Sequence, residues 1–223
     1  MPSVPLFDSL SLGIVLGGTA LATVLRSGRV ELTMTLRALA GLFAPRFSAA
    51  QAKADLVTHV SAIRRDGLLR ANSGPIGDSE FADATDALFR SRSLDALIER
   101  HHAHRRARLA AADAAVRTLV QAAELGPVFG MVGTLVSLSR LPTTGLDQGA
   151  LNATVAMAVM TTLYGLLLAN LLLAPLARAV ERRAQDEERQ RLEVIEWLSG
   201  QLEPALSGPP SVQRLHPRPR VAG

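Results

Sequence analysis

The sequence contains no cysteine, which excludes disulfide bonds and thiol chemistry and disfavours a zinc site. Aromatic residues make up only 4% of the chain, so few rings are available to stack on nucleic-acid bases. Of its 24 lysine and arginine residues, 15 lie between residues 26 and 117, eight lie between 178 and 220, and the last is Arg140. Basic segments that alternate with uncharged ones indicate membrane topology rather than a phosphate-binding surface, and we expect no nucleic-acid partner.

Charged side chains are also missing from three apolar segments. The longest, residues 148–177, runs for 30 residues, and about 20 are enough to cross a bilayer. Residues 9–25 would span about 25 Å as a helix, and the adjacent Arg26 can snorkel to complete the crossing. The uncharged core of the third segment, residues 125–139, is short, but the chain must return across the membrane between the other two. The sequence therefore predicts three spans in the bilayer.

These spans predict an all-α membrane protein with three transmembrane helices, a helical cytosolic domain and long cytosolic helix extensions. Arginine follows the first span, so the N-terminus is expected outside the cytosol, and without a basic n-region this span is expected to be retained. The predicted order is an external N-terminus at 1–8, a first transmembrane helix at 9–25, a cytosolic helical domain at 26–113, a stalk and second transmembrane helix at 114–141, an external hairpin at 142–149, a third transmembrane helix at 150–177, a cytosolic helix at 178–203 and a disordered tail at 204–223.

Residues with N-capping side chains mark helix starts within the predicted cytosolic domain. Ser48, with Gln51 three residues later, has the pattern of a capping box. Asp78 or Ser79 can cap a short helix, and Ser93 can cap a longer one. We therefore expect three helices to begin at these points.

Several motifs in the right order carry a resemblance to a known family. Residues 126–135 read Gly-Pro-Val-Phe-Gly-Met-Val-Gly-Thr-Leu, residues 161–165 read Thr-Thr-Leu-Tyr-Gly, and an Ala-Asn…Ala-Pro-Leu-Ala run covers 169–177. Together with the Gly-rich residues 12–23 and the Arg-x-x-Gly segment within 63–69, these motifs resemble the MotA/TolQ/ExbB proton channel family, most closely its flagellar-stator branch, MotA. The resemblance covers roughly residues 9–180.

The chain departs from the MotA pattern in two respects. It has three predicted spans where MotA has four, and three is the number in TolQ and ExbB. Where the MotA pattern commonly has a Leu-Glu pair that meets the flagellar rotor, this chain has Ala71 and Asn72, so the acidic member is missing. Arg64 is the rotor-type residue that is retained, and its alternative role is that of a solvated surface arginine.

No aspartate or glutamate lies in the central part of any predicted span. A proton path through hydrocarbon needs a titratable group, because a permanent charge at the bilayer centre is costly. The resemblance implies that a single-span partner of the MotB, ExbD or TolR type supplies an aspartate. It also implies a homopentamer around a dimer of partner spans. We expect no cofactor apart from the transported ion, which is H⁺ or, as the alternative, Na⁺, and no metal site.

The same resemblance implies that Thr134 and Thr162 line the pore and face the partner's aspartate. The alternative is that each hydroxyl bonds a carbonyl of its own helix. Thr161 points about 100° away from Thr162 around a helix, so we expect it to support the pore and to meet another subunit. Tyr164 is expected either to hydrogen bond near the pore or to pack as an amphipathic residue. Asn170 is also expected to support the pore, by an interhelical hydrogen bond, with a gate as the alternative role.

Two prolines and one acid lie near the predicted cytosolic ends of the spans. Pro127 and Pro175 each remove a backbone donor and permit a bend, which could act as a hinge between the spans and the cytosolic domain. Glu124 at the inner mouth could receive protons, or it could be a solvated interface charge. The histidines within residues 101–104 lack a completing set of carboxylates, and we expect them to form a solvated face rather than a metal site.

The sequence as a whole predicts the pore-forming subunit of a motor in the bacterial inner membrane that couples ion flow to mechanical work. Two alternatives are a non-conducting membrane scaffold and an envelope energiser of the TolQ/ExbB type. An enzyme is disfavoured, because the sequence has no nucleophile–base set, metal-ligand spacing or Gly-rich phosphate loop.

Overall fold

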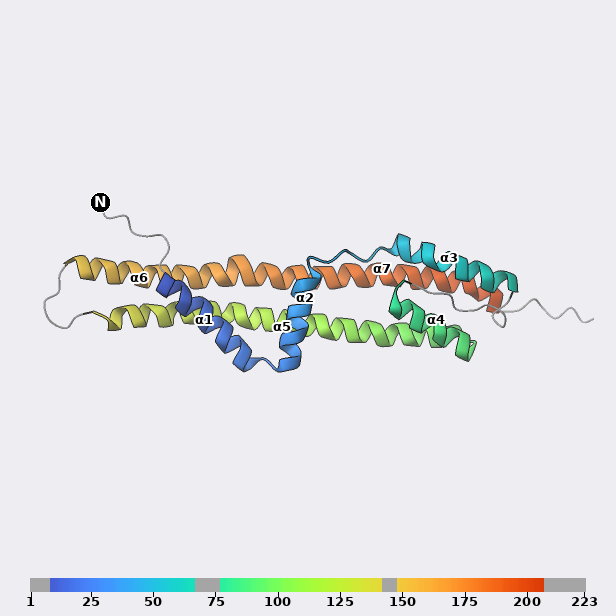
Figure 1. Ribbon diagram of the computed structural model, residues 1–223, viewed down its shortest axis with the longest axis horizontal. Coiled ribbons are helices and arrows are strands. Elements are labelled where there is room, and N and C mark those ends of the chain that lie inside the picture. The colour runs from blue at the N-terminus through green and yellow to red at the C-terminus, as the bar shows by residue number, and fades with distance from the viewer. Residues whose placement is uncertain (1–8, 67–76, 142–147, 207–223) are drawn as a thin grey trace, which may run out of the picture. The chain divides into compact units, whose positions relative to one another are not determined.

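The computed structural model describes residues 9–66, 77–141 and 148–206, with the side chains of 62–66 and 204–206 left aside. Every regular element in these ranges is a helix (Figure 1), which confirms the predicted all-α fold. The elements are α1 (Ser9–Arg26), α2 (Arg29–Gly41), α3 (Ala49–Asp66), α4 (Ser79–Ser91), α5 (Leu94–Ser139), α6 (Gln148–Leu167), the π-helical η1 (Leu168–Leu173) and α7 (Ala174–Leu206).

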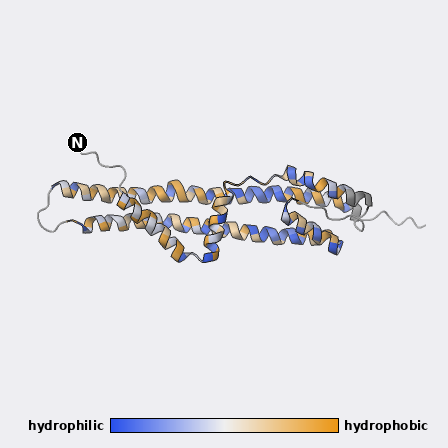
Figure 2. Ribbon diagram, viewed as in Figure 1, coloured by the Kyte–Doolittle hydropathy of each residue, from blue (hydrophilic) through white to orange (hydrophobic). Residues whose placement is uncertain are grey.

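The chain divides into two compact units, each of which takes in two separate stretches of sequence. One, here called the span unit, comprises Met1–Arg46 and Arg106–Glu187. The other, here called the distal unit, comprises Phe47–Arg105 and Glu188–Gly223. Three helical stretches are long and apolar enough to cross a membrane, namely Ser9–Arg26, Leu94–Ser139 and Gln148–Glu203. Hydrophobic colour in Figure 2 accordingly dominates α1, α6 and the adjacent half of α5.

The span unit depends on a close contact between α5 and α6. A Cβ atom added at Gly126 of α5 would lie 2.8 Å from the carbonyl oxygen of Gly165 in α6, and a Cβ at Gly165 would lie 2.5 Å from the carbonyl oxygen of Gly126. Both distances are too short for a real side chain, so the two backbones touch. Gly130 and Gly133 continue the contact one and two turns along α5 against the segment that includes Thr161. Small residues allow this approach, and close van der Waals packing is what holds helices together in lipid.

The first span and the short helix that follows it pack onto this pair. The ring of Phe129 in α5 lies where a side chain at Gly18 of α1 would be, so α1 is held against α5 as well as against α6. Helix α2 packs through partly buried Leu39 and Leu42 on a second small core, in which the buried residues of α5 and α7 are Ala115, Leu119, Ala177 and Val180.

An arginine of α7 fixes the C-terminal end of α2. The Arg183 guanidinium donates from Nη1 to the carbonyl oxygen of Leu42 at 3.4 Å, and from Nη2 to those of Ala44 and Pro45 at 3.0 Å each. Leu42 is the C-cap of α2, and Ala44 and Pro45 follow it, so the cation bonds carbonyls of the turn that leaves the helix. It also lies near the partial negative charge of the helix C-terminus.

The distal unit has an apolar core built by α3, α4, the start of α5 and the end of α7. Its most deeply buried side chains are those of Leu56, Leu88, Leu97, Val194 and Leu202, each no more than 1% exposed.

The predicted capping residues lie where these helices begin. Ser48 Oγ accepts from the N–H of Gln51 at 3.4 Å, and Ser93 Oγ accepts from that of Asp95 at 3.1 Å. Asp78, rather than Ser79, caps α4, because its carboxylate accepts from the N–H groups of Glu80 and Phe81. Three helix starts in the distal unit are therefore explained by local side-chain bonds.

The expected solvated face of the histidines is only partly observed, and the interpretation is wrong for His101. His101 is 5% exposed, because the packing of the distal unit covers it, and its Nε2 has no partner in the described part of the chain. His102 is exposed, as expected. His104 Nε2 lies 2.7 Å from a carboxylate oxygen of Asp83, which also receives the Arg100 guanidinium at 2.6 Å. The hydrogen bond from Arg100, then that from His104, lowers the pKa of Asp83.

Replacing Gly165 by alanine tests the contact between α5 and α6. We expect the thermal unfolding midpoint of the detergent-solubilised protein to fall, because overpacking a tight contact costs about 1–3 kcal/mol. Gly13→Ala is the matched control, since Gly13 is exposed and a Cβ there meets nothing within 4 Å. Equal midpoints for the two variants would show that the backbones do not touch at Gly165.

Burial of His101 predicts a pH-dependent stability. Burial lowers the pKa of His101, an effect opposed by Glu188 and reinforced by His102, Arg191 and Arg105. The unfolded chain therefore takes up a proton at this residue at higher pH than the folded chain does. The free energy of unfolding therefore decreases as the pH falls below 6.5, the ordinary pKa of histidine.

The measurement compares unfolding midpoints between pH 7.5 and pH 5 for wild type, His101→Leu and His102→Leu. We expect the decline on acidification to be smaller in His101→Leu than in wild type, because the buried group that must otherwise stay neutral is gone. The exposed His102 provides the control, and its replacement is expected to leave the decline as in wild type. The prediction is contradicted if His101→Leu follows the wild-type curve.

Candidate functional site

The two predicted pore threonines lie in one layer of the α5–α6 pair. A Cβ at Gly130 of α5 would lie 3.2 Å from the Cα of Thr162, and one at Gly133 would meet the Thr161 side chain at 2.7 Å. Thr134 directly follows Gly133 and is one turn beyond Gly130, so it lies within about one turn of Thr162 along the pair. Both threonines are half-buried. The fold thus places two threonines that are 28 residues apart in the sequence within about one turn of each other along the helix pair.

Each of these hydroxyls donates to a carbonyl of its own helix in this structure. Thr134 Oγ1 donates to the carbonyl oxygen of Met131 at 2.6 Å, and Thr162 Oγ1 donates to that of Ala158 at 3.4 Å. The second bond is long and therefore weak. A hydroxyl with one local bond keeps its acceptor lone pairs, and it can rotate to donate to a stronger acceptor. The pair can therefore bind a carboxylate or a water without contributing any charge.

Thr161 faces α5 rather than another subunit, so that part of its predicted role is wrong. Its side chain is 0% exposed and packs on Gly133 of the same chain. Its Oγ1 donates to the carbonyl oxygen of Ala158 at 2.8 Å, which satisfies the hydroxyl within the helix. Thr161 can support the layer by fixing the distance between α5 and α6, and the sequence signal that could have shown this was the row of glycines opposite.

Asn170 does not make the expected bond to another helix of the chain. Its Nδ2 donates to the carbonyl oxygen of Leu166 at 3.0 Å, four residues earlier in the same helix, and the side chain is exposed. The neighbouring Ala169 is buried against Gly126 of α5, whereas Asn170 is exposed. A hydrogen bond from Asn170 to a helix of another subunit stays a prediction. Tyr164 is half-buried on α6, and both of its proposed roles stay predictions.

A π-helical segment that the sequence analysis missed precedes the second proline. Pro175 has no N–H, so the carbonyl of Leu171 loses its usual donor four residues on. The helix instead shifts to bonds spanning five residues through η1, as when the N–H of Ala174 donates to the carbonyl oxygen of Ala169. Such π segments often occur at functional sites. Pro175 was the signal for this irregularity, but a proline alone does not distinguish a bend from a π segment.

The two prolines act at the same level of the helix pair. Pro127 lies inside the continuous α5, where it deprives the carbonyl of Ala123 of its helical donor. The preceding Gly126 approaches Ala169 of η1, with 3.3 Å between a Cβ built on the glycine and that of the alanine. The backbone irregularity of one helix is therefore next to that of the other. Glu124, three residues before Pro127, is exposed.

Some predicted residues contribute nothing to the site as described. Arg64 belongs to α3, but its side chain lies outside the described residues, and so do Ala71 and Asn72. Among the residues that the structure describes, no group of three histidine, aspartate or glutamate side chains could hold a metal ion.

Several known proteins are similar to this chain in sequence. Motility protein A of Cereibacter sphaeroides is 29% identical over 208 residues, a match that covers 88% of this chain and 78% of the relative. Chemotaxis protein PomA of Vibrio alginolyticus is 35% identical over 68 residues, which cover 30% of this chain and only 27% of the relative. This shorter match supports the similarity over only part of the chain.

Solved structures share the fold at low sequence identity. The structure of C. jejuni MotAB superposes with a TM-score of 0.79 at 19% identity, covering 89% of this chain and 79% of that one. The flagellar MotAB stator complex from Bacillus subtilis superposes with a TM-score of 0.76 at 18% identity, covering 93% and 83%.

A family-level match settles the classification. The sequence model of the MotA/TolQ/ExbB proton channel family matches residues 75–193, more than half of the 223 residues, and this match includes the α5–α6 contact and the threonine layer. The chain belongs to the MotA/TolQ/ExbB proton channel family.

Proposed function

We propose that this chain is the pore-forming subunit of an ion-driven motor in the bacterial inner membrane, and that it converts proton flow into mechanical work. Family membership supports this proposal, as do relatives named Motility protein A and the fold shared with MotAB stator complexes. The observation that carries it is the neutral α5–α6 pair, in which two half-buried threonine hydroxyls lie in one layer. A conduit wall of this kind holds a carboxylate but does not supply one.

The proposal requires a partner that brings the titratable group. The apolar parts of the three candidate spans carry no aspartate or glutamate. A single-span protein of the MotB, ExbD or TolR type would supply an aspartate opposite Thr134 and Thr162, and a homopentamer would surround the partner spans. The ionised carboxylate would accept hydrogen bonds from the two hydroxyls, which would rotate away from the carbonyls of Met131 and Ala158. Protonation would weaken these bonds and free the partner span to turn to the next subunit.

The energy available is sufficient for such steps. Each proton that crosses 100 mV releases about 2.3 kcal/mol. Because a hydrogen bond to a charged group contributes about 1.5–3 kcal/mol, one proton is comparable to one such bond. Pro127 and the π-helical η1 lie next to the site and make this part of the helix pair flexible. Rotation of the spans is then transmitted through it to α7. We propose the N-terminus outside, since Arg26 and Arg29 follow the first span.

Replacing one hydroxyl by a methyl group tests the pore role. Thr162→Val keeps the shape of the side chain but removes the donor, so we expect proton flux and motor output to fall about tenfold or more, as for loss of one hydrogen bond to a charge. Flux is measured as proton uptake into inverted vesicles that contain the co-expressed partner. The matched control is Thr154→Val on the same helix, because the Thr154 hydroxyl likewise donates to a carbonyl of its own helix, that of Ala150, at 2.9 Å.

The outcome separates the proposal from a non-conducting scaffold. Such a scaffold is the second candidate, because both pore threonines are satisfied by their own helix in the chain alone. If Thr162→Val and Thr154→Val both retain wild-type flux, the pore assignment is wrong. If wild type with its partner conducts no ions at all, the scaffold is favoured. Whether the motor serves flagellar rotation or the energising of the envelope, as in TolQ and ExbB, is decided by the domain attached to the partner's span.

A further inference from the structure

Helix α2 lies where the apolar part of the span unit gives way to charge. It begins three residues after the exposed Arg26, the last residue of α1. Its inner face packs on a core whose members in α5 and α7 are close in sequence to the exposed Arg117 and Arg178. Charged residues therefore lie at this level in α1, α5 and α7 alike. In Figure 1, α2 runs across α5 and α7 rather than along them.

One flank of α2 exposes large apolar side chains. Leu36 is 59% exposed, and Phe43, in the turn just after the helix, is 91% exposed. The two are seven residues apart, which is close to two helical turns, so they share a flank with the half-buried Leu32. Val30 is 65% exposed on the outward face. Exposure of this extent on a short helix is costly in water and needs an apolar surrounding.

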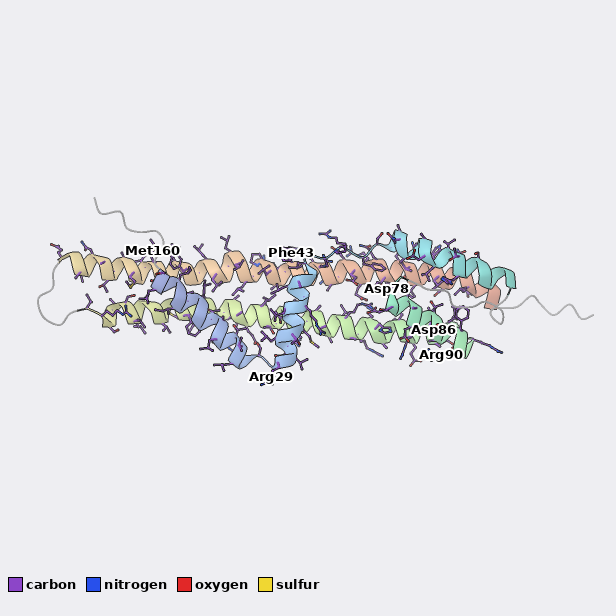
Figure 3. All side chains as sticks on the ribbon, in the orientation of Figure 1. Arg29, Phe43, Asp78, Asp86, Arg90 and Met160 are labelled. Atoms are coloured by element: carbon purple, nitrogen blue, oxygen red, sulfur yellow. The ribbon has the colours of Figure 1, made fainter. Side chains whose placement is uncertain are left out.

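Cations without acidic partners lie on and beside the apolar flank of α2, with Arg29 seven residues before Leu36 on that flank and Arg37 next to Leu36 in the sequence. Arg29 and Arg37 are exposed, as is Arg26 just before the helix, and none of them makes an ion pair within the described ranges. The only acid of α2, Glu31, accepts a bond from the N–H of Gly28 at 3.3 Å at the start of the helix. Figure 3 marks Arg29 and Phe43 at the two ends of α2.

We propose that α2 is an interfacial helix that binds anionic phospholipid. Its Leu36–Phe43 flank enters the boundary between headgroups and acyl chains, and Arg29 and Arg37 bind headgroup phosphates. A lipid surface fits both features at once, because it offers hydrocarbon on one side and negative charge beside it, and α2 is continuous with a span that ends at this surface. The inference goes beyond ion conduction, since it requires only that α1 crosses the bilayer.

The position of the apolar flank is tested by fluorescence on single cysteines. The chain has no cysteine of its own, so Leu36→Cys and Phe43→Cys can each be labelled uniquely with bimane. The full chain is placed in nanodiscs that contain phosphatidylglycerol, with either a nitroxide near the start of the lipid acyl chain or iodide in the buffer as quencher. Met34→Cys is the matched control, because Met34 is two residues from Leu36 and about 160° away around the helix.

We expect the lipid nitroxide to quench the labels at 36 and 43 about twofold or more above the label at 34, and iodide to show the opposite order. This is the pattern for a helix whose apolar face lies about 5–10 Å into the interface. Equal access of iodide to 36 and 34 would place α2 in the cytosol and overturn the proposal. So would a label at 36 that neither quencher reaches, because a second copy of the chain would then cover it.

The role of the arginines is tested separately by lipid selectivity. Spin-labelled phosphatidylglycerol and phosphatidylcholine compete for the full chain, and the ratio of their association constants is measured. We expect Arg29→Gln with Arg37→Gln to lower the preference for phosphatidylglycerol by about fivefold per arginine. The control carries two exposed arginines of the distal unit, as Arg90→Gln with Arg189→Gln, and should keep the wild-type ratio. An equal change in both double variants, or no change in the first, would overturn headgroup binding.

Discussion

The approach of two backbones at Gly126 and Gly165 is the constraint on which the rest of the span unit depends. In lipid there is no hydrophobic force between helices, so close packing and local hydrogen bonds must hold the pair together. The same contact fixes the level at which Thr161 is buried. It thereby also fixes where Thr134 and Thr162 emerge beside it. A looser contact would leave the hydroxyls present but their separation undefined.

The distribution of titratable groups gives the two units different roles. The apolar parts of the three candidate spans carry no aspartate or glutamate. The distal unit contains buried and paired charge instead, with Arg191 3.0 Å from Asp78 and over the Phe47 ring, and His101 covered nearby. The uncharged segments and the paired charges are thus separated along the chain.

Sequence patterns predicted the features that are encoded locally. The three helix starts at Ser48, Asp78 and Ser93 follow from side chains that bond the backbone two or three residues on, and the all-α class follows from long uncharged runs. Features that depend on what lies opposite were missed or wrong. The burial of Thr161 requires knowing that Gly133 faces it, and that of His101 depends on which segments cover α5. The π-helical η1 required knowing how the hydrogen-bond ladder would shift around Pro175.

The guanidinium of Arg183, bonded to three carbonyl oxygens after α2, has a consequence for how this attachment responds to pH. A guanidinium stays charged and carbonyls stay neutral throughout the physiological range, so this joint does not respond to local acidification. A histidine in the same place would gain or lose a donor as the local pH changed. The hydrogen bonds of Arg183 to the turn after α2 therefore persist across this range.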